Sequence, residues 1–213
     1  MDLCLSCKGC TSECPSNVDM STLKAEFLHQ YYKENGVPLR AKAFAYINEF
    51  NKLGGVAPSV YNFFLTNSIV SKIAKKILGV APERSLPKIH KFSLRKWHQK
   101  NYQKKEAKNG TVILFCDEFT NWNDTEIGIK SIELLQALNY HVKLIEHPES
   151  GRAAISKGLL KRAQEMANKN VTIFKDIINE STPLLGVEPS AILSFRDEYP
   201  RLVNDSLKSD AKR

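Results

Sequence analysis

The spacing of apolar residues along the chain changes near residue 110. Before that point apolar side chains recur every three or four residues, which is the period of an α-helix with one apolar face. Asp19 is a suitable N-cap for the first long helix, in which Leu23, Phe27 and Tyr31 recur at helical spacing. The first eighty residues are therefore expected to be all-helical, with helices predicted over 20–35, 39–53, the residues after Pro58, and 68–78.

From residue 111 onward short apolar runs alternate with helical periodicity. The run TVILFC is rich in β-branched residues and predicts a buried strand. Alternation of strand and helix predicts a small parallel sheet covered by helices, of βαβαβ type. The polar residues 206–213 are expected to fray. The strands are predicted over 111–116, 140–145 and 184–187, and the helices after Asp124, over 153–167, over 171–179, and from Pro189.

A basic segment separates these two patterns. Residues 81–110 carry nine Lys or Arg and two acidic residues, a net charge of +7, whereas the whole chain carries +8. Pro82, Pro87 and few periodic apolar positions indicate a linker with a short helical turn near 94–99. The predicted fold class is thus α followed by α/β, divided into a helical segment 1–80, a basic linker 81–110 and an α/β unit 111–213.

Four of the five cysteines lie within eleven residues near the start of the chain. Disulfide scaffolds spread their cysteines along the chain, so this grouping indicates a metal site in a reducing compartment. The spacing C-x2-C-x2-C-x3-C-P is the bacterial ferredoxin pattern, in which short gaps let one loop wrap a cubane cluster. The candidate cofactor is therefore a [4Fe–4S] cluster, and its candidate metal ligands are Cys4, Cys7, Cys10 and Cys14.

A structural zinc site is the alternative for these cysteines. Zinc sites usually pair two CxxC units across a longer loop, so the observed spacing favours the cluster. In two-cluster proteins the fourth cysteine of such a run binds the other cluster, so Cys14 would reach toward a second one. The chain contains no second cysteine run. We therefore expect the partner run on another chain, or in a longer protein of which this sequence is a piece.

Five segments spread over the chain resemble a known family. They are DLCLSCKGCTSECPSNVDMSTLKAEFLHQYY (2–32) and residues 84–97, 117–135, 149–164 and 186–200. They resemble the iron–sulfur and cysteine-rich (CCG-type) C-terminal region of FAD-linked oxidases, the dehydrogenases of D-lactate, glycolate or 2-hydroxyglutarate. Related iron–sulfur subunits occur in glycolate oxidase and in anaerobic glycerol-3-phosphate dehydrogenase.

The resemblance implies an α-helical ferredoxin-like half followed by an incomplete CCG-type domain. It also implies that FAD on an absent upstream region or partner chain passes electrons through the cluster to a quinone or cytochrome. The double-cysteine motif is missing, because HPESGRAAISKG (147–158) stands in its place, and Ser190 stands where a cysteine is expected. We therefore expect a fragment or truncated member, part of an oxidoreductase but not catalytic alone.

The partners and location follow from charge and hydropathy. No apolar window approaches the roughly 18 residues that a membrane span needs, and no signal peptide is evident, so a cytoplasmic protein is expected. The basic linker, with Phe92, Trp97 and Tyr102, could stack on nucleic acid. The resemblance favours docking to a flavoprotein domain or subunit, or peripherally to the inner face of the membrane, and no nucleic acid is expected. The alternative function is a non-catalytic, zinc-stabilised interaction module with a basic partner- or nucleic-acid-binding arm.

Several residues outside the cysteine run are weaker candidates. Arg152 follows a glycine between a strand and a helix, where it could bind an anion or simply belong to an ordinary βα turn. Cys116 ends the first strand and is either a ligand or a core residue. His141 and His147 flank the second strand, but nothing at ligand spacing pairs them into a metal site.

Overall fold

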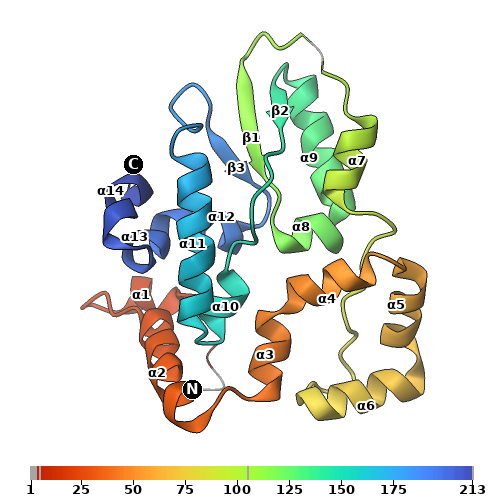
Figure 1. Ribbon diagram of the computed structural model, residues 1–213, viewed down its shortest axis with the longest axis vertical. Helices are drawn as coiled ribbons and strands as arrows, with labels where there is room; N and C mark the ends of the chain where they lie inside the picture. The colour runs from red at the N-terminus through yellow and green to blue at the C-terminus, as the bar shows by residue number, and fades with distance from the viewer. Residues whose placement is uncertain (1–3, 5, 105, 213) are drawn as a thin grey trace.

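The computed structural model describes residues 4, 6–104 and 106–212, which form a mostly helical protein with one small sheet (Figure 1). The helices of the N-terminal part lie below the sheet in this view, and a segment containing one helix leads from them to the first strand. The N-terminal helices are α1 (Gly9–Glu13), α2 (Met20–Asn35), α3 (Leu39–Ala45), α4 (Ile47–Gly54), α5 (Pro58–Thr66) and α6 (Ser68–Leu78).

Local signals place the ends of these helices. The Asp19 carboxylate accepts hydrogen bonds from the amides of Ser21 and Thr22 at 3.0 and 3.1 Å, which caps α2 as predicted. The prediction of one helix over 39–53 was wrong. Tyr46 leaves the helical conformation (φ −108°, ψ 23°) and separates α3 from α4. The break lets α4 pack against the next part of the chain, where Asn48 Oδ1 accepts from the indole nitrogen of Trp122 at 3.1 Å.

Helix α2 buries a different face from the one its apolar residues mark. Leu23, Phe27 and Tyr31 remain about half exposed, whereas Lys24 and Ala25 are buried. Ala25 belongs to a small apolar cluster with Ala154, Ile155 and Ala163 of the C-terminal part. The small side chains let α2 lie close beside α10 and α11 (Figure 1). The two parts of the chain are therefore joined by packing as well as by the linker.

Three parallel strands form the sheet, in the order β2-β1-β3. They are β1 (Thr111–Phe115), β2 (His141–Lys143) and β3 (Leu184–Gly186). The central strand is apolar on both faces, as the continuous run predicted. Val112 and Leu114 pack toward Leu94 and Ile132 on one side. Ile113 and Phe115 pack toward Phe174 on the other, so helices cover both faces. The parallel sheet is confirmed.

The remaining helices begin in the linker and continue to the C-terminal end of the described chain. They are α7 (Leu94–Asn101), α8 (Glu118–Trp122), α9 (Thr125–Ala137), α10 (Arg152–Ser156), α11 (Leu160–Phe174), α12 (Pro189–Asp197), α13 (Tyr199–Leu202), the 3₁₀ turn η1 (Asp205–Leu207) and α14 (Lys208–Lys212). Helix α7 forms where a helical turn was expected.

Two helix predictions in this part were wrong. Helices over 153–167 and 171–179 were expected, but α10 ends early and α11 runs through to Phe174. Gly158 separates them with φ +72°, and a Cβ at this glycine would lie 2.5 Å from Leu28 Cβ of α2. The expected fraying over 206–213 was also wrong as far as Lys212. Leu207 and Ala211 pack on the cluster around Tyr199, which orders η1 and α14.

Candidate iron–sulfur site

The cysteine segment is a tight turn followed by one short helix. Ser6 and Lys8, on either side of Cys7, both have left-handed backbones, with φ +56° and +62°. Helix α1 then carries Cys10, whose carbonyl accepts a hydrogen bond from the amide of Cys14 at 2.9 Å. All four cysteines are free thiols, and none is buried. Each sulfur can therefore be reached by iron and sulfide.

Backbone amides that follow Cys14 in the chain act on its thiol. Hydrogen bonds from the amides of Val18, Ser16 and Asn17 lower the pKa of the Cys14 thiol. Such bonds favour the thiolate, which is the form that binds metal. Amides directed at sulfur are also one of the features that set the potential of iron–sulfur clusters.

The donor set fits an iron–sulfur cluster, although its members do not converge in this conformation. Among the residues that the structure describes, no three His, Cys, Asp or Glu side chains gather closely enough to hold a metal ion. Four accessible thiols on eleven residues remain the soft ligand set that such clusters use. Binding of a cluster would bring together thiols that are already close in sequence, on the turn and on α1.

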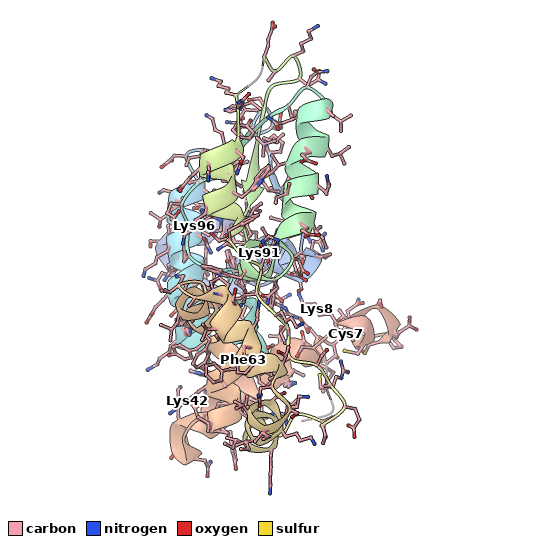
Figure 2. The ribbon with its side chains drawn as sticks, turned by 90° about the vertical axis from the view of Figure 1, so that its right-hand side faces the viewer. Cys7, Lys8, Lys42, Phe63, Lys91 and Lys96 are labelled. Carbon is pink, nitrogen blue, oxygen red and sulfur yellow. The ribbon has the colours of Figure 1, made fainter. Side chains whose placement is uncertain are left out.

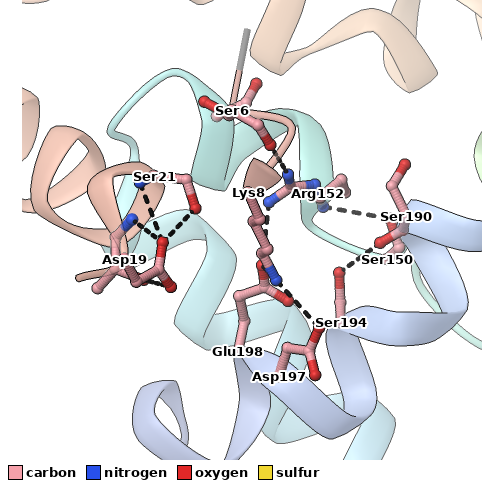
Figure 3. A network of polar contacts seen from close by, with 12 residues as sticks. Ser6, Lys8, Asp19, Ser21, Ser150, Arg152, Ser190, Ser194, Asp197 and Glu198 are labelled. Carbon is pink, nitrogen blue, oxygen red and sulfur yellow. Dashed lines mark hydrogen bonds and ion pairs between the residues drawn. The ribbon is translucent and has the colours of Figure 1, made fainter. Parts of the chain in front are cut away.

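Residues far along the chain hold the cysteine segment in place (Figure 3). Arg152 donates from Nη2 to the Ser6 carbonyl at 2.8 Å and from Nη1 to Glu198 Oε1 at 3.1 Å. Lys8 Nζ lies 2.6 Å from the same Glu198 oxygen and 3.2 Å from Asp197 Oδ2. Arg152 thus contacts protein oxygens, which occupies the guanidinium that the sequence offered as an anion site.

A buried carboxylate, that of Glu118, fixes the turn at Ser150 that precedes Arg152. Glu118 accepts hydrogen bonds from the Ser150 amide at 2.9 Å and from its hydroxyl at 2.8 Å. The Tyr199 hydroxyl donates to the Ser150 carbonyl at 2.8 Å. Burial raises the pKa of Glu118 to about 7, against the lowering effect of the Ser150 bonds. Sequence reasoning missed Glu118; the acidic pair Asp117-Glu118 directly after a buried strand was its only signal.

Cys116 and His147 contact each other at the end of β1. His147 Nε2 accepts from the Cys116 amide at 3.1 Å, while Nδ1 lies 2.6 Å from the Pro148 carbonyl, so the ring fits as the neutral Nδ1–H tautomer. Burial lowers the pKa of His147 to about 3 and raises that of Cys116 to about 12. Both are therefore held in their neutral forms, and Cys116 belongs to the core. His141 Nδ1 lies 2.7 Å from the Tyr102 hydroxyl, which pairs this histidine with the linker.

Sequence comparison connects this arrangement to known proteins. Over 207 residues, 93% of the chain, it is 28% identical to D-2-hydroxyglutarate dehydrogenase of Escherichia coli K12. The chain is related to the C-terminal region of D-2-hydroxyglutarate dehydrogenases. The Haemophilus influenzae D-2-hydroxyglutarate dehydrogenase is 26% identical over 96% of the chain. Against these two relatives the chain spans about a fifth of their length, 20% and 21%.

A second kind of relative carries a different name. One subunit of the anaerobic glycerol-3-phosphate dehydrogenase of Escherichia coli K12 is 24% identical over 137 residues, 63% of this chain and 35% of that protein. These relatives are of the kinds that the sequence segments resembled, so the predicted resemblance is confirmed. No family model matches the chain, and no solved structure matches it. In the part of the chain that the structure describes, no helix is both long enough and apolar enough to span a membrane.

Proposed function

We propose that this chain is the iron–sulfur, electron-transfer portion of an oxidoreductase that acts on a D-2-hydroxy acid. The observation that carries the proposal is the ferredoxin-type run of accessible thiols on a chain related to D-2-hydroxyglutarate dehydrogenases. Cys4, Cys7, Cys10 and Cys14 would hold a [4Fe–4S] cluster. When bound, the cluster supplies one-electron transfer between a flavin and a quinone or cytochrome.

The chain's own residues would prepare the ligands. The amides around Cys14 favour its thiolate, and the left-handed residues around Cys7 curl the backbone about that thiol. Where a second cysteine run is present, as in two-cluster proteins, Cys14 would instead bind the second cluster. The exposed stripe Leu23, Phe27 and Tyr31 lies on α2, directly after the cysteine run, and we propose that it packs against the segment that carries the second cysteine run.

A second apolar surface supports docking of a flavoprotein domain or subunit, which would carry the FAD. Between Phe50 and Pro82 the chain has four lysines and no acidic residue. Figure 2 views this side of the protein and labels Phe63 of α5, together with Lys42 and Lys91. A group of exposed apolar residues of this kind is typical of a protein or membrane interface. Its exposed apolar residues are Phe50, Leu53, Val56, Val60, Phe63, Phe64, Ile69, Val70, Ile73 and Ile77.

Anaerobic reconstitution with iron and sulfide tests the proposed function. We expect about four irons and about four sulfides per chain, the complement of one cubane cluster. Three single variants, with serine in place of Cys4, Cys7 or Cys10, should each bind less iron and lose the spectrum of the intact cluster. Cys116→Ser is the matched control, because that buried thiol should leave iron binding unchanged.

The same experiment distinguishes the alternative. One zinc and no iron per chain after anaerobic expression would contradict electron transfer and would indicate a zinc-stabilised interaction module. Iron binding that persists unchanged in the Cys4, Cys7 and Cys10 variants would also refute the proposed ligand set.

A further inference from the structure

We propose that Arg152 and Lys8 are positioning residues that lock the turn around Cys7 onto the α/β part of the protein. We call residues 6–8 the Cys7 turn. The shape of this turn is then set by side chains of α10 and of the junction between α12 and α13, rather than by the cysteine segment alone. The consequence for cluster retention rests on the proposed function, whereas the anchoring of the turn does not.

The Cys7 turn needs an external anchor because its backbone is strained. Ser6 and Lys8 both adopt positive φ, a backbone conformation that is unfavourable for residues other than glycine. Within the segment, the Lys8 carbonyl accepts one hydrogen bond, from the Thr11 amide at 3.0 Å. Both strained residues contact the α/β part, Ser6 through its carbonyl and Lys8 through its ammonium group.

Arg152 is itself held rigidly. Its amide donates to Ser150 Oγ at 3.1 Å, and Ser150 is fixed by the buried Glu118 and by Tyr199. A continuous set of hydrogen bonds therefore runs from the protein interior to the Ser6 carbonyl. The planar guanidinium serves two acceptors at once, the Ser6 carbonyl and Glu198, which a lysine ammonium on a flexible stem would reproduce poorly.

Glu198 joins the two cations into one network (Figure 3). Its carboxylate contacts both Lys8 and Arg152, and Asp197 beside it contacts Lys8 as well. The side chains of Lys8, Arg152 and Glu198 are 25%, 14% and 12% exposed, so solvent screens them less than a surface pair. Holding Cys7 between two such contacts reduces the conformational entropy that ligand gathering must overcome.

Hydrogen exchange on the metal-free chain tests the anchor directly. In Arg152→Gln, amides of the Cys7 turn and of α1, including Thr11, should exchange about tenfold faster, as expected for loss of a charge-assisted hydrogen bond. Amides of β1 should be unchanged. Arg152→Lys should recover part of the protection, because it keeps the charge and one contact. Arg84→Gln, which removes an exposed arginine from the linker, is the control for net charge.

Iron release from the reconstituted chain gives an independent readout. A chelator should remove iron about tenfold faster from Arg152→Gln than from the parent chain, and the midpoint potential of the cluster should shift, while Arg84→Gln behaves as the parent. If the parent binds no iron but exchange at the turn still responds, the proposed function fails and the anchor stands.

Lys8→Gln guards against a general loss of folding. If β1 amides in Arg152→Gln also lose protection, Lys8→Gln decides, because Lys8 lies outside the α/β core and its removal should loosen only the turn. Unchanged exchange at the turn in both variants would overturn the proposal.

Discussion

Replacing Glu118 by glutamine should remove a pH-dependent penalty from the folded protein. Glu118 is buried, and the amide and hydroxyl of Ser150 both donate to its carboxylate. A glutamine fits the same place, because its oxygen can accept from the Ser150 amide and its nitrogen can donate to the hydroxyl. The substitution therefore mimics the protonated acid and never carries a charge.

The size of the effect follows from the pKa of Glu118. Burial raises this pKa from 4.5 to about 7, so the folded chain holds a proton that the unfolded chain releases between these values. The free energy of unfolding contributed by Glu118 is therefore fully present below pH 4.5 and is lost as the pH rises through 7. At about 1.4 kcal/mol per pH unit the loss amounts to about 3 kcal/mol.

Urea unfolding, followed by circular dichroism between about pH 5 and about pH 8, measures this difference. Glu118→Gln should be more stable than the parent at the alkaline end, by about 3 kcal/mol, and similar to it at the acid end. Glu165→Gln on α11 is the matched control, because that carboxylate is exposed. A variant with the same pH dependence as the parent, or with lower stability at about pH 8, would refute the reasoning.

Three further predictions concern the α/β part. Burial lowers the pKa of His147 to about 3, so the stability contributed by His147 should fall as the pH drops below 6.5, opposite in sign to the Glu118 contribution, and His147→Gln should gain stability relative to the parent toward the acid end of the same urea series. Burial raises the pKa of Cys116 to about 12, so an alkylating reagent should label the four N-terminal cysteines of the native chain but not Cys116; mass spectrometry showing a fifth label would contradict this. Leu114→Ala should lower the free energy of unfolding by about 2–5 kcal/mol, and a loss below about 1 kcal/mol would show that Leu114 is not a core residue.

Much of the fold could be predicted because its signals are local. The apolar run of β1 predicts a strand without reference to the rest of the chain, and the Asp19 cap predicts the start of α2. The errors arose where distant contacts decide. The break at Tyr46 turns α4 toward Trp122, and Gly158 ends α10 against α2; neither partner is visible from the local pattern.

The candidate site divides in the same way. The cysteine run is evident from its spacing, which follows from the chemistry of thiolate ligands. The contacts that hold the run in place are not evident from the sequence, because Ser6 and Arg152 lie 146 residues apart and no periodicity connects them. The role of Arg152 was open between anion binding and an ordinary turn, and only its contacts with Ser6 and Glu198 show which groups it serves.

The distance in sequence between Lys8 and its acidic partners has a consequence for biosynthesis. Lys8 and Asp197 are separated by 189 residues, so at about 5–20 residues per second the ribosome makes the cysteine segment about 10–40 s before the carboxylates that fix it. During that interval Lys8, and with it the Cys7 turn, lacks its acidic partners. Under the proposed function, cluster insertion would meet an anchored turn only after α12 and α13 have been made.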